Sequence, residues 1–187
     1  MAGRALLTVG HTSEKAGTCR VIELAPNKEI KWREYDICLW FAKKVPSYLK
    51  ELNVEPQLLY DKPINEKVAL INADRSFSLC IEFHTWLGGK GIRVLYGKGN
   101  ERAKSYAEII AKHLHATVLA DSDIQRVHKG VIVYWKSIFL REVKNGVPLI
   151  IELGCMDNDE DLANITSKNW QEEMAKTLAT AIKEITQ

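Results

Sequence analysis

Short apolar runs alternate along the chain with longer segments in which apolar residues recur at helical spacing. The short runs predict strands at residues 5–9, 58–60, 77–83, 92–96 and 139–143, and a last strand from Val147 that ends on Glu152. The longer segments predict helices at residues 34–52, 64–73, 101–114 and 168–185, and a short helix that begins at about residue 159.

Strands that alternate with helices in this way predict an α/β fold. We expect a twisted, mostly parallel central sheet of about six strands, flanked by helices. No linker or repeat divides the sequence, so residues 1–187 are expected to form a single domain. Pro46 should kink or split the first long helix. Residues 116–135 are less regular, and the apolar residues 131–135 are a candidate wall of a substrate groove.

Composition narrows the possible partners and the site of action. A net charge of +2 gives no reason to expect a nucleic-acid partner, and no apolar run is long enough to span a membrane. The N-terminus lacks the features of a signal peptide, so synthesis in the cytoplasm is expected.

The four cysteines form no CxxC pair and are expected to be reduced and packed as small apolar residues. We expect a monomer, and we expect no phosphate site at Gly97–Gly99, because that segment lacks the full fingerprint of a phosphate loop.

Glu152 is the first candidate for chemistry. A carboxylate at the end of a core strand is costly unless a metal ion or a proton-transfer role accompanies it. His11 follows the first predicted strand and His84 ends another. Ligands gather at the carboxyl ends of parallel strands, so these three side chains should converge. Two histidines and one carboxylate, with one coordination position left open, are a common catalytic zinc set.

Glu34 is the carboxylate best placed to be the third ligand, because it begins a helix, and Glu152 is then free to act as a base. Simpler interpretations exist for each residue. His11 could be an exposed loop histidine, and Glu34 could merely offset the helix dipole. Glu82 shares a strand face with His84, so it could line the cavity, support a ligand or contact substrate.

Several short motifs, taken in order, carry a resemblance to a known family. They are the Gly-His segment at residues 8–12, the Glu at the start of the first long helix, the strand that ends at His84, the segment 91–96 and the segment 148–161. Together they cover essentially the whole chain. They resemble the zinc-dependent N-acetylmuramoyl-L-alanine amidases of the amidase-3 group, which include the catalytic domains of phage endolysins.

The resemblance implies that His11, Glu34 and His84 bind Zn²⁺ and that Glu152 is the catalytic carboxylate. The implied substrate is bacterial peptidoglycan, cleaved at the amide between the lactyl group of N-acetylmuramic acid and L-alanine. Glu152 would take a proton from the attacking water and return it to the leaving amine. The chain departs from the family at Trp86, where the family usually has Asn. Trp86 could stack on substrate, so Trp86 and Glu82 are candidate substrate contacts.

The loop at residues 85–91 is too short for the autoinhibitory helix of some division-associated members, which favours an open site like that of an endolysin. Two other functions stay open at this point. The chain could be another zinc amidohydrolase or carboxypeptidase that acts on a small acylamino acid, or an inactive module that only binds the wall. The complete set of candidate residues argues against an inactive module, and the shape of the cleft should separate the two hydrolases.

Overall fold

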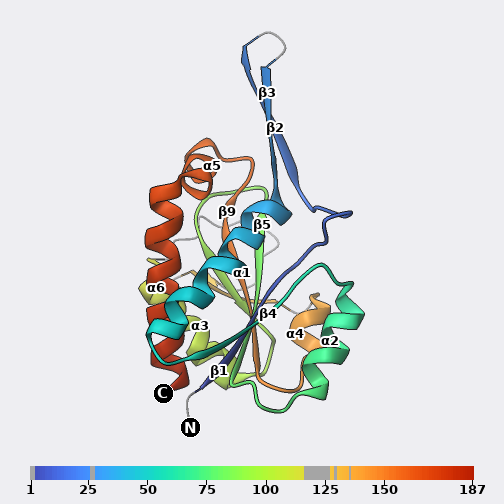
Figure 1. Ribbon diagram of the computed structural model, residues 1–187, viewed down its shortest axis with the longest axis vertical. Helices are drawn as coiled ribbons and strands as arrows, with labels where there is room; N and C mark the ends of the chain where they lie inside the picture. The colour runs from blue at the N-terminus through green and yellow to red at the C-terminus, as the bar shows by residue number, and fades with distance from the viewer. Residues whose placement is uncertain (1–2, 26–27, 116–126, 129, 135) are drawn as a thin grey trace.

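The computed structural model describes residues 3–25, 28–115, 127–128, 130–134 and 136–187, and the fold is a mostly parallel sheet between two layers of helices (Figure 1). The described strands of this sheet lie in the order β4-β1-β5-β9-β6-β8-β7. Neighbouring strands from β4 to β9 are parallel, β6 is antiparallel to β9, and β8 is parallel to β6. The predicted α/β fold class is therefore confirmed.

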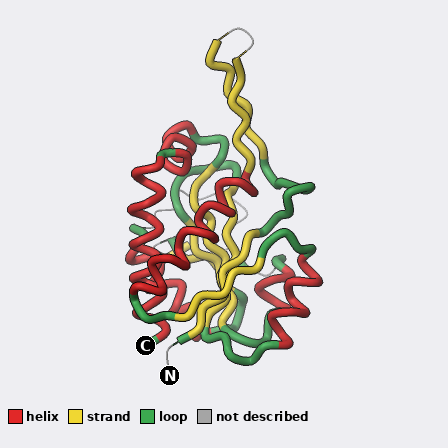
Figure 2. Tube along the Cα trace, in the orientation of Figure 1, coloured by secondary structure: helices red, strands yellow, loops and turns green. Residues whose placement is uncertain are grey.

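The strands of the sheet are β1 (Arg4–Val9), β4 (Glu55–Leu59), β5 (Leu79–Trp86), β6 (Arg93–Tyr96), β7 (Val127–His128), β8 (Val131–Val133) and β9 (Val147–Cys155). The helices are α1 (Glu34–Glu51), α2 (Ile64–Ala73), α3 (Glu101–His113), α4 (Ile138–Glu142), α5 (Asp159–Thr166) and α6 (Lys168–Thr186). In Figure 2 the helices lie on either side of the strands, with α2 and α4 on one side and α1, α3 and α6 on the other.

Alternation along the strands builds two cores. Successive side chains of a strand point to opposite faces of the sheet. Leu7 of β1 and Ile81 of β5 lie in the larger core, together with apolar residues of α1, α3, α5 and α6. Leu6 and Cys80, one residue earlier on the same strands, lie in the smaller core with α2 and α4. The alternation therefore decides which side of the sheet each later residue of β5 and β9 faces.

A two-stranded hairpin projects from this body, formed by β2 (Cys19–Ala25) and β3 (Lys28–Arg33) (Figure 1). The sequence analysis did not predict it, because residues 10–18 are polar and contain glycine, and the apolar residues Val21, Ile22 and Leu24 that follow form only a short run. The hairpin leads directly into α1, whose first residue is Glu34. It therefore fixes where the first turn of α1 begins.

One prediction of local structure was wrong, and one of the two outcomes expected at Pro46 does not occur. Residues 139–143 were expected to be a strand, but residues 139–142 belong to the short helix α4 and Val143 follows its end. The Ser137 side chain caps this helix by accepting a hydrogen bond from the Leu140 N–H. The same apolar residues fill the smaller core from a helix, so burial alone did not specify a strand. Pro46 does not split α1, which runs without a break through it.

Other predictions need smaller changes. The strand expected at residues 77–83 begins two residues later and continues to Trp86, so His84 lies within β5 and does not follow it. Of the segment 131–135, Val131 and Ile132 are buried, and residue 135 lies outside the described residues, as do residues 116–126.

Among the residues that the structure describes, no helix has the length and apolar character needed to cross a membrane. Cys38, Cys80 and Cys155 are buried free thiols, and Cys19 is an exposed one.

Candidate metal centre

Three neighbouring parallel strands bring the candidate residues together. His11 lies two residues beyond the end of β1. His84 lies on β5 and pairs in register with Glu152 on the adjacent strand β9. Glu34 reaches the same place from the first turn of α1. The sequence argument for convergence at one edge of the sheet thus describes the arrangement that the structure has.

Glu34 lies between the two histidines. Its Oε1 is 3.1 Å from His84 Nδ1, and its Oε2 is 3.2 Å from His11 Nε2. One ligand atom from each of the three residues lies within 4.8 Å of the other two. The two imidazole rings meet edge to face, with their centroids 5.3 Å apart. These three side chains therefore present their nitrogen and oxygen atoms to a common point.

Backbone donors hold the Glu34 carboxylate in place. The carboxylate is only 3% exposed, and it accepts hydrogen bonds from the Thr18 N–H at 2.9 Å and the Thr85 N–H at 3.0 Å. Burial alone would raise the pKa of Glu34, but hydrogen bonds from His11 and His84 outweigh it and hold that pKa well below its usual range. Glu34 is therefore an anion in a fixed orientation, as a metal-binding carboxylate needs to be.

Two glycines make room for this cluster. A Cβ at Gly10 would lie 1.8 Å from Cε1 of the His84 ring. Gly17 has a φ of +72°, and a Cβ there would lie 2.4 Å from Glu34 Oε2. Real Cβ atoms do not approach other atoms so closely, and a positive φ favours glycine in any case. The backbone thus passes within contact distance of the candidate ligands at two points.

A buried ion pair lies behind His84. Glu82, which shares a strand face with His84, accepts from Lys67 Nζ at 2.5 Å, and its other oxygen is 3.2 Å from His84 Nε2. Burial would lower the pKa of His84, yet the flanking carboxylates of Glu34 and Glu82 raise it to about 10. The positive charge of His84 is therefore balanced from both sides.

Glu152 has a different environment from the other carboxylates. It forms an ion pair with Arg93 Nε, and the two side chains are 13% and 11% exposed. Burial raises the pKa of Glu152 above its ordinary value, while the Arg93 charge and hydrogen bond oppose that rise. The Arg93 guanidinium in turn lies 3.5 Å over the ring of Trp86, whose Nε1 donates to the Gly91 carbonyl.

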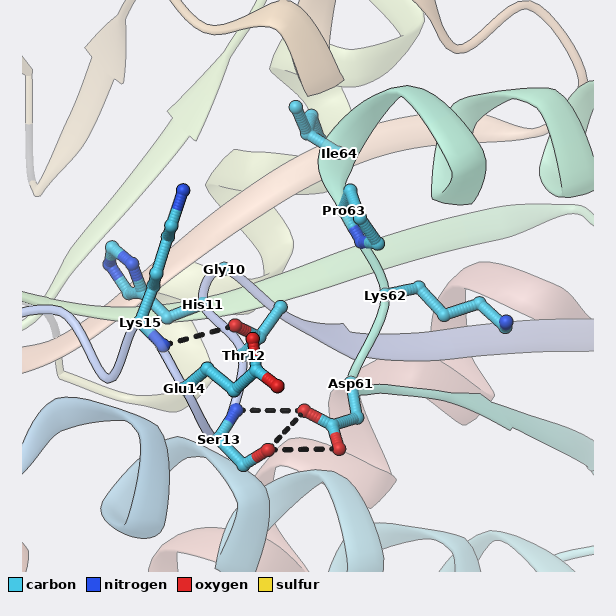
Figure 3. Close-up of a pocket in the computed structure, with 10 residues that line it drawn as sticks. All are labelled: Gly10, His11, Thr12, Ser13, Glu14, Lys15, Asp61, Lys62, Pro63 and Ile64. Carbon is cyan, nitrogen blue, oxygen red and sulfur yellow. Dashed lines mark hydrogen bonds between the residues drawn. The ribbon is translucent and has the colours of Figure 1, made fainter.

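Two adjoining cavities reach the histidines, and His84 lines one of them while His11 lines the other. One, of about 350 Å³, is lined by Glu82, His84 and Glu152 together with residues of α2, α4 and β9. The other, of about 500 Å³, is lined by residues 10–15 and 61–64. Figure 3 shows its wall, in which Asp61 accepts from the backbone N–H and the hydroxyl of Ser13. Gly10 and Ile64 line both cavities, so the cavities adjoin beside Gly10, the residue before His11.

Sequence reasoning missed two residues that shape this region. Lys67 was not singled out, although it lies one helical turn before Ile71 on a helix whose apolar face is buried. Arg93 lies among other basic residues in the sequence, a pattern that is typical of a solvated surface. A lysine on the apolar stripe of a helix could have been noticed, but the pairing of Arg93 with Glu152 depends on β6 lying antiparallel to β9.

The donor set of His11, Glu34 and His84 suits a divalent metal ion. Two imidazole nitrogens and one carboxylate oxygen, with room for a further ligand, are a common catalytic zinc set. A nearby carboxylate with a raised pKa, such as Glu152, is suited to proton transfer. An α/β sheet that carries such a set at the ends of its strands has the features of a metal-dependent hydrolase.

Comparison with known proteins gives the family. The family model of the N-acetylmuramoyl-L-alanine amidases (Amidase_3) matches residues 6–184. The chain therefore belongs to the N-acetylmuramoyl-L-alanine amidase family, which confirms the resemblance seen in the sequence. It is accordingly an enzyme of the peptidoglycan amidase class. No curated protein matches the sequence.

Solved structures have the same fold at low sequence identity. The N-acetylmuramyl-L-alanine amidase Ami1 from Mycobacterium abscessus is 15% identical with a TM-score of 0.78, and the match covers 100% of both chains. The amidase AmiC2 of Nostoc punctiforme is 19% identical with a TM-score of 0.75, covering 97% of this chain and 96% of that one. The catalytic domain of the CD27L endolysin, which targets Clostridia difficile, is 21% identical with a TM-score of 0.70, covering 96% of each chain.

Proposed function

We propose that this chain is a zinc-dependent amidase that cleaves the amide between the lactyl group of N-acetylmuramic acid and the L-alanine of the stem peptide. One observation carries the proposal. His11, Glu34 and His84 present ligand atoms within 4.8 Å of one another, and Glu152 lies beside His84 on the next strand. Membership of the amidase family supports the class of reaction, and the family match to residues 6–184 supports a single catalytic domain over residues 1–187.

In this proposal His11, Glu34 and His84 hold the zinc ion. The ion, when bound, supplies Lewis-acid activation of water and of the scissile carbonyl. The Glu34 carboxylate is already ionised, and two backbone N–H donors fix its orientation. Little rearrangement is therefore needed when the metal ion binds. Three protein ligands leave one coordination position for the reaction.

Glu152 acts as the proton-transfer group. It takes a proton from the attacking water and delivers it to the leaving nitrogen of L-alanine. A carboxylate with a raised pKa is a better base than an ordinary one, and when protonated it can still donate. Arg93 fixes the carboxylate through its ion pair and limits the rise in pKa.

The substrate is proposed to lie across the two cavities that meet at Gly10 and Ile64. A site that continues from the cavity beside His84 into the cavity beside His11 suits a peptide joined to a glycan strand better than it suits a small acylamino acid. Trp86 is only 5% exposed and its ring is covered by Arg93, so we propose that it supports Arg93 and does not stack on substrate. Glu82 lines the cavity wall but is 3% exposed and engaged with Lys67 and His84.

Digestion of purified peptidoglycan, with and without a chelator and followed by mass analysis of the products, tests the reaction. We expect soluble stem peptides that begin with L-alanine, and we expect the chelator to stop their release until Zn²⁺ is restored. New reducing ends of sugars would indicate a glycosidase and refute the proposal. Hydrolysis of a small acylamino acid but not of peptidoglycan would favour the other zinc hydrolase.

Substitutions separate the two roles. Glu152→Ala should abolish turnover and keep the bound zinc, because Glu152 is not among the proposed ligands. His84→Ala should lose the metal and the activity together. Glu173→Ala, which removes an exposed carboxylate of α6, is the matched control and should keep both. Near-normal wall lysis by Glu152→Ala would show that the assigned role is wrong.

We further propose that the enzyme is an endolysin of a phage or prophage, with a site that is open without an activator. Only residues 87–92 separate β5 from β6, and no helix is inserted there. The similarity to the CD27L endolysin supports the same idea. The purified enzyme should therefore digest peptidoglycan without any added protein. A requirement for an activating partner would refute this part of the proposal.

A further inference from the structure

A completely buried lysine lies behind the proposed metal centre. Lys67 is 0% exposed, and Glu82, its partner, is 3% exposed. Removing two opposite charges from water is costly, so a buried ion pair is weak evidence for stability. Apolar residues of similar size would often serve the fold as well. The position of the pair therefore suggests a purpose other than stability.

The pair is connected to both histidine-bearing strands. Lys67 Nζ donates to Glu82 Oε1 and to the Val9 carbonyl, each at 2.5 Å. Val9 is the last residue of β1 and lies two residues before His11. Glu82 and His84 lie on β5. The ammonium group thus links the end of β1, which leads to His11, with β5, which carries His84.

The second oxygen of Glu82 determines which way His84 faces. Glu82 Oε2 is 3.2 Å from His84 Nε2, whereas Glu34 Oε1 is 3.1 Å from His84 Nδ1. An ionised carboxylate can only accept hydrogen bonds, so each ring nitrogen donates where it faces a carboxylate. Glu34 also contacts His11 Nε2, at 3.2 Å, so Nδ1 faces the side that the three candidate ligands share, whereas Nε2 faces the pair of Glu82 and Lys67. A metal ion held by the three candidate ligands would therefore take the place of the Nδ1 proton and leave Nε2–H bonded to Glu82.

We propose that Lys67 and Glu82 are positioning residues, which hold the His84 ring with Nε2 as the hydrogen-bond donor and Nδ1 as the zinc-binding atom. The inference rests on the proposed metal centre and goes beyond it by naming the ligand atom and its support. Such a partner for a metal-binding histidine fixes the ring and raises its basicity as a ligand. Glu82 in this role is fully engaged and is not a substrate contact.

Charge-free variants test the role without leaving a buried charge unpaired. In Lys67→Met/Glu82→Leu both charges are replaced by apolar side chains, so the fold should be kept while His84 loses its acceptor. In Lys67→Met/Glu82→Gln the amide oxygen can still accept from Nε2–H. Ile71→Ala, on the same helix and in the smaller core, is the control for loosening of α2.

Zinc affinity, measured by competition with a chelator, and thermal unfolding of the metal-free proteins are the two readouts. We expect the leucine double variant to bind zinc about 10- to 100-fold more weakly, as is typical when such a partner is lost. The glutamine double variant should recover much of that affinity. Ile71→Ala should lower the unfolding temperature and leave the zinc affinity of the folded protein unchanged.

Nitrogen-15 spectra of the zinc-loaded wild-type protein give an independent test that needs no variant. We expect Nε2 of His84 to carry a proton and Nδ1 to be the metal-bound nitrogen. Metal on Nε2, or wild-type zinc affinity in the leucine double variant, would overturn the inference and leave the proposed function intact. Failure of the wild-type protein to bind zinc would instead overturn the metal centre and this inference with it.

Discussion

The pH dependence of activity should be controlled by Arg93, because Arg93 is the cation paired with the proposed proton-transfer group Glu152. Replacement of Arg93 by methionine removes this charge and keeps an extended apolar side chain against Trp86. Burial raises the pKa of Glu152, and Arg93 provides the largest effect that lowers it. Without Arg93 the pKa of Glu152 should therefore rise further.

The size of the change follows from the geometry of the pair. Opposite charges about 4 Å apart, in surroundings with an effective dielectric constant of about 20, attract by about 4 kcal/mol. At about 1.4 kcal/mol for each pKa unit, this corresponds to about 3 units. Both side chains keep some contact with solvent, at 11% and 13% exposure, so we treat this as an upper limit. A rise of about 1–3 units is expected.

The sign follows from the role of Glu152. The carboxylate must be ionised to take a proton from water, so activity is lost as the pH falls through its pKa. A higher pKa moves this loss to higher pH. The acidic limb of the pH profile of kcat/KM, measured by release of stem peptides from peptidoglycan, should therefore shift upward by about 1–3 units.

Arg102→Met is the matched control for this experiment. The Arg102 guanidinium also lies over an aromatic ring, 5.3 Å from the centroid of Tyr106, but it is exposed and donates to the Tyr106 hydroxyl. This control should leave the acidic limb where it is in the wild-type enzyme. An unshifted limb in Arg93→Met, with zinc content retained, would refute the assignment of that limb to Glu152 under the control of Arg93.

Three further predictions concern the packing of the chain. Gly10→Ala should lose zinc on dialysis, because a Cβ there would lie 1.8 Å from the His84 ring; a wild-type zinc content would contradict the packing argument. The native protein should show one fast thiol toward a disulfide reagent at pH 8, since Cys19 is exposed and burial raises the pKa of Cys80 to about 12. Rapid reaction of a second thiol would show that a core cysteine is accessible. Pro46→Ala should raise the free energy of unfolding in urea by about 1–3 kcal/mol, because it restores a hydrogen-bond donor inside α1; a destabilised variant would disprove this.

The order of the main elements could be predicted from the sequence because their patterns are local. The helix at residues 64–73 has the predicted bounds, and α1 differs from its prediction by one residue at its end. His11, His84 and Glu152 could be proposed as neighbours because each lies at or near the end of an apolar run. The carboxyl ends of parallel strands share an edge, whatever the details of packing.

Local pattern was insufficient where the same residues suit more than one structure. Phe139, Leu140 and Val143 fill a core equally well from a helix, and the Ser137 cap and the contacts with α2 favour α4. The hairpin β2–β3 was missed because its strands pair only with each other, and apolar side chains such as Val21 and Ile30 stay exposed. A pattern of apolar residues predicts an element from its burial against a core, and this hairpin projects away from the core (Figure 1).

The tertiary structure alone decided how the candidate residues are connected. The sequence determined that two histidines, Glu34 and Glu152 were available near strand and helix ends. It did not determine that Glu82 pairs with Lys67 behind His84, or that Arg93 pairs with Glu152, because these contacts join residues 15 and 59 positions apart. They depend on the packing of α2 against the sheet and on the antiparallel placement of β6, which arise from the fold as a whole.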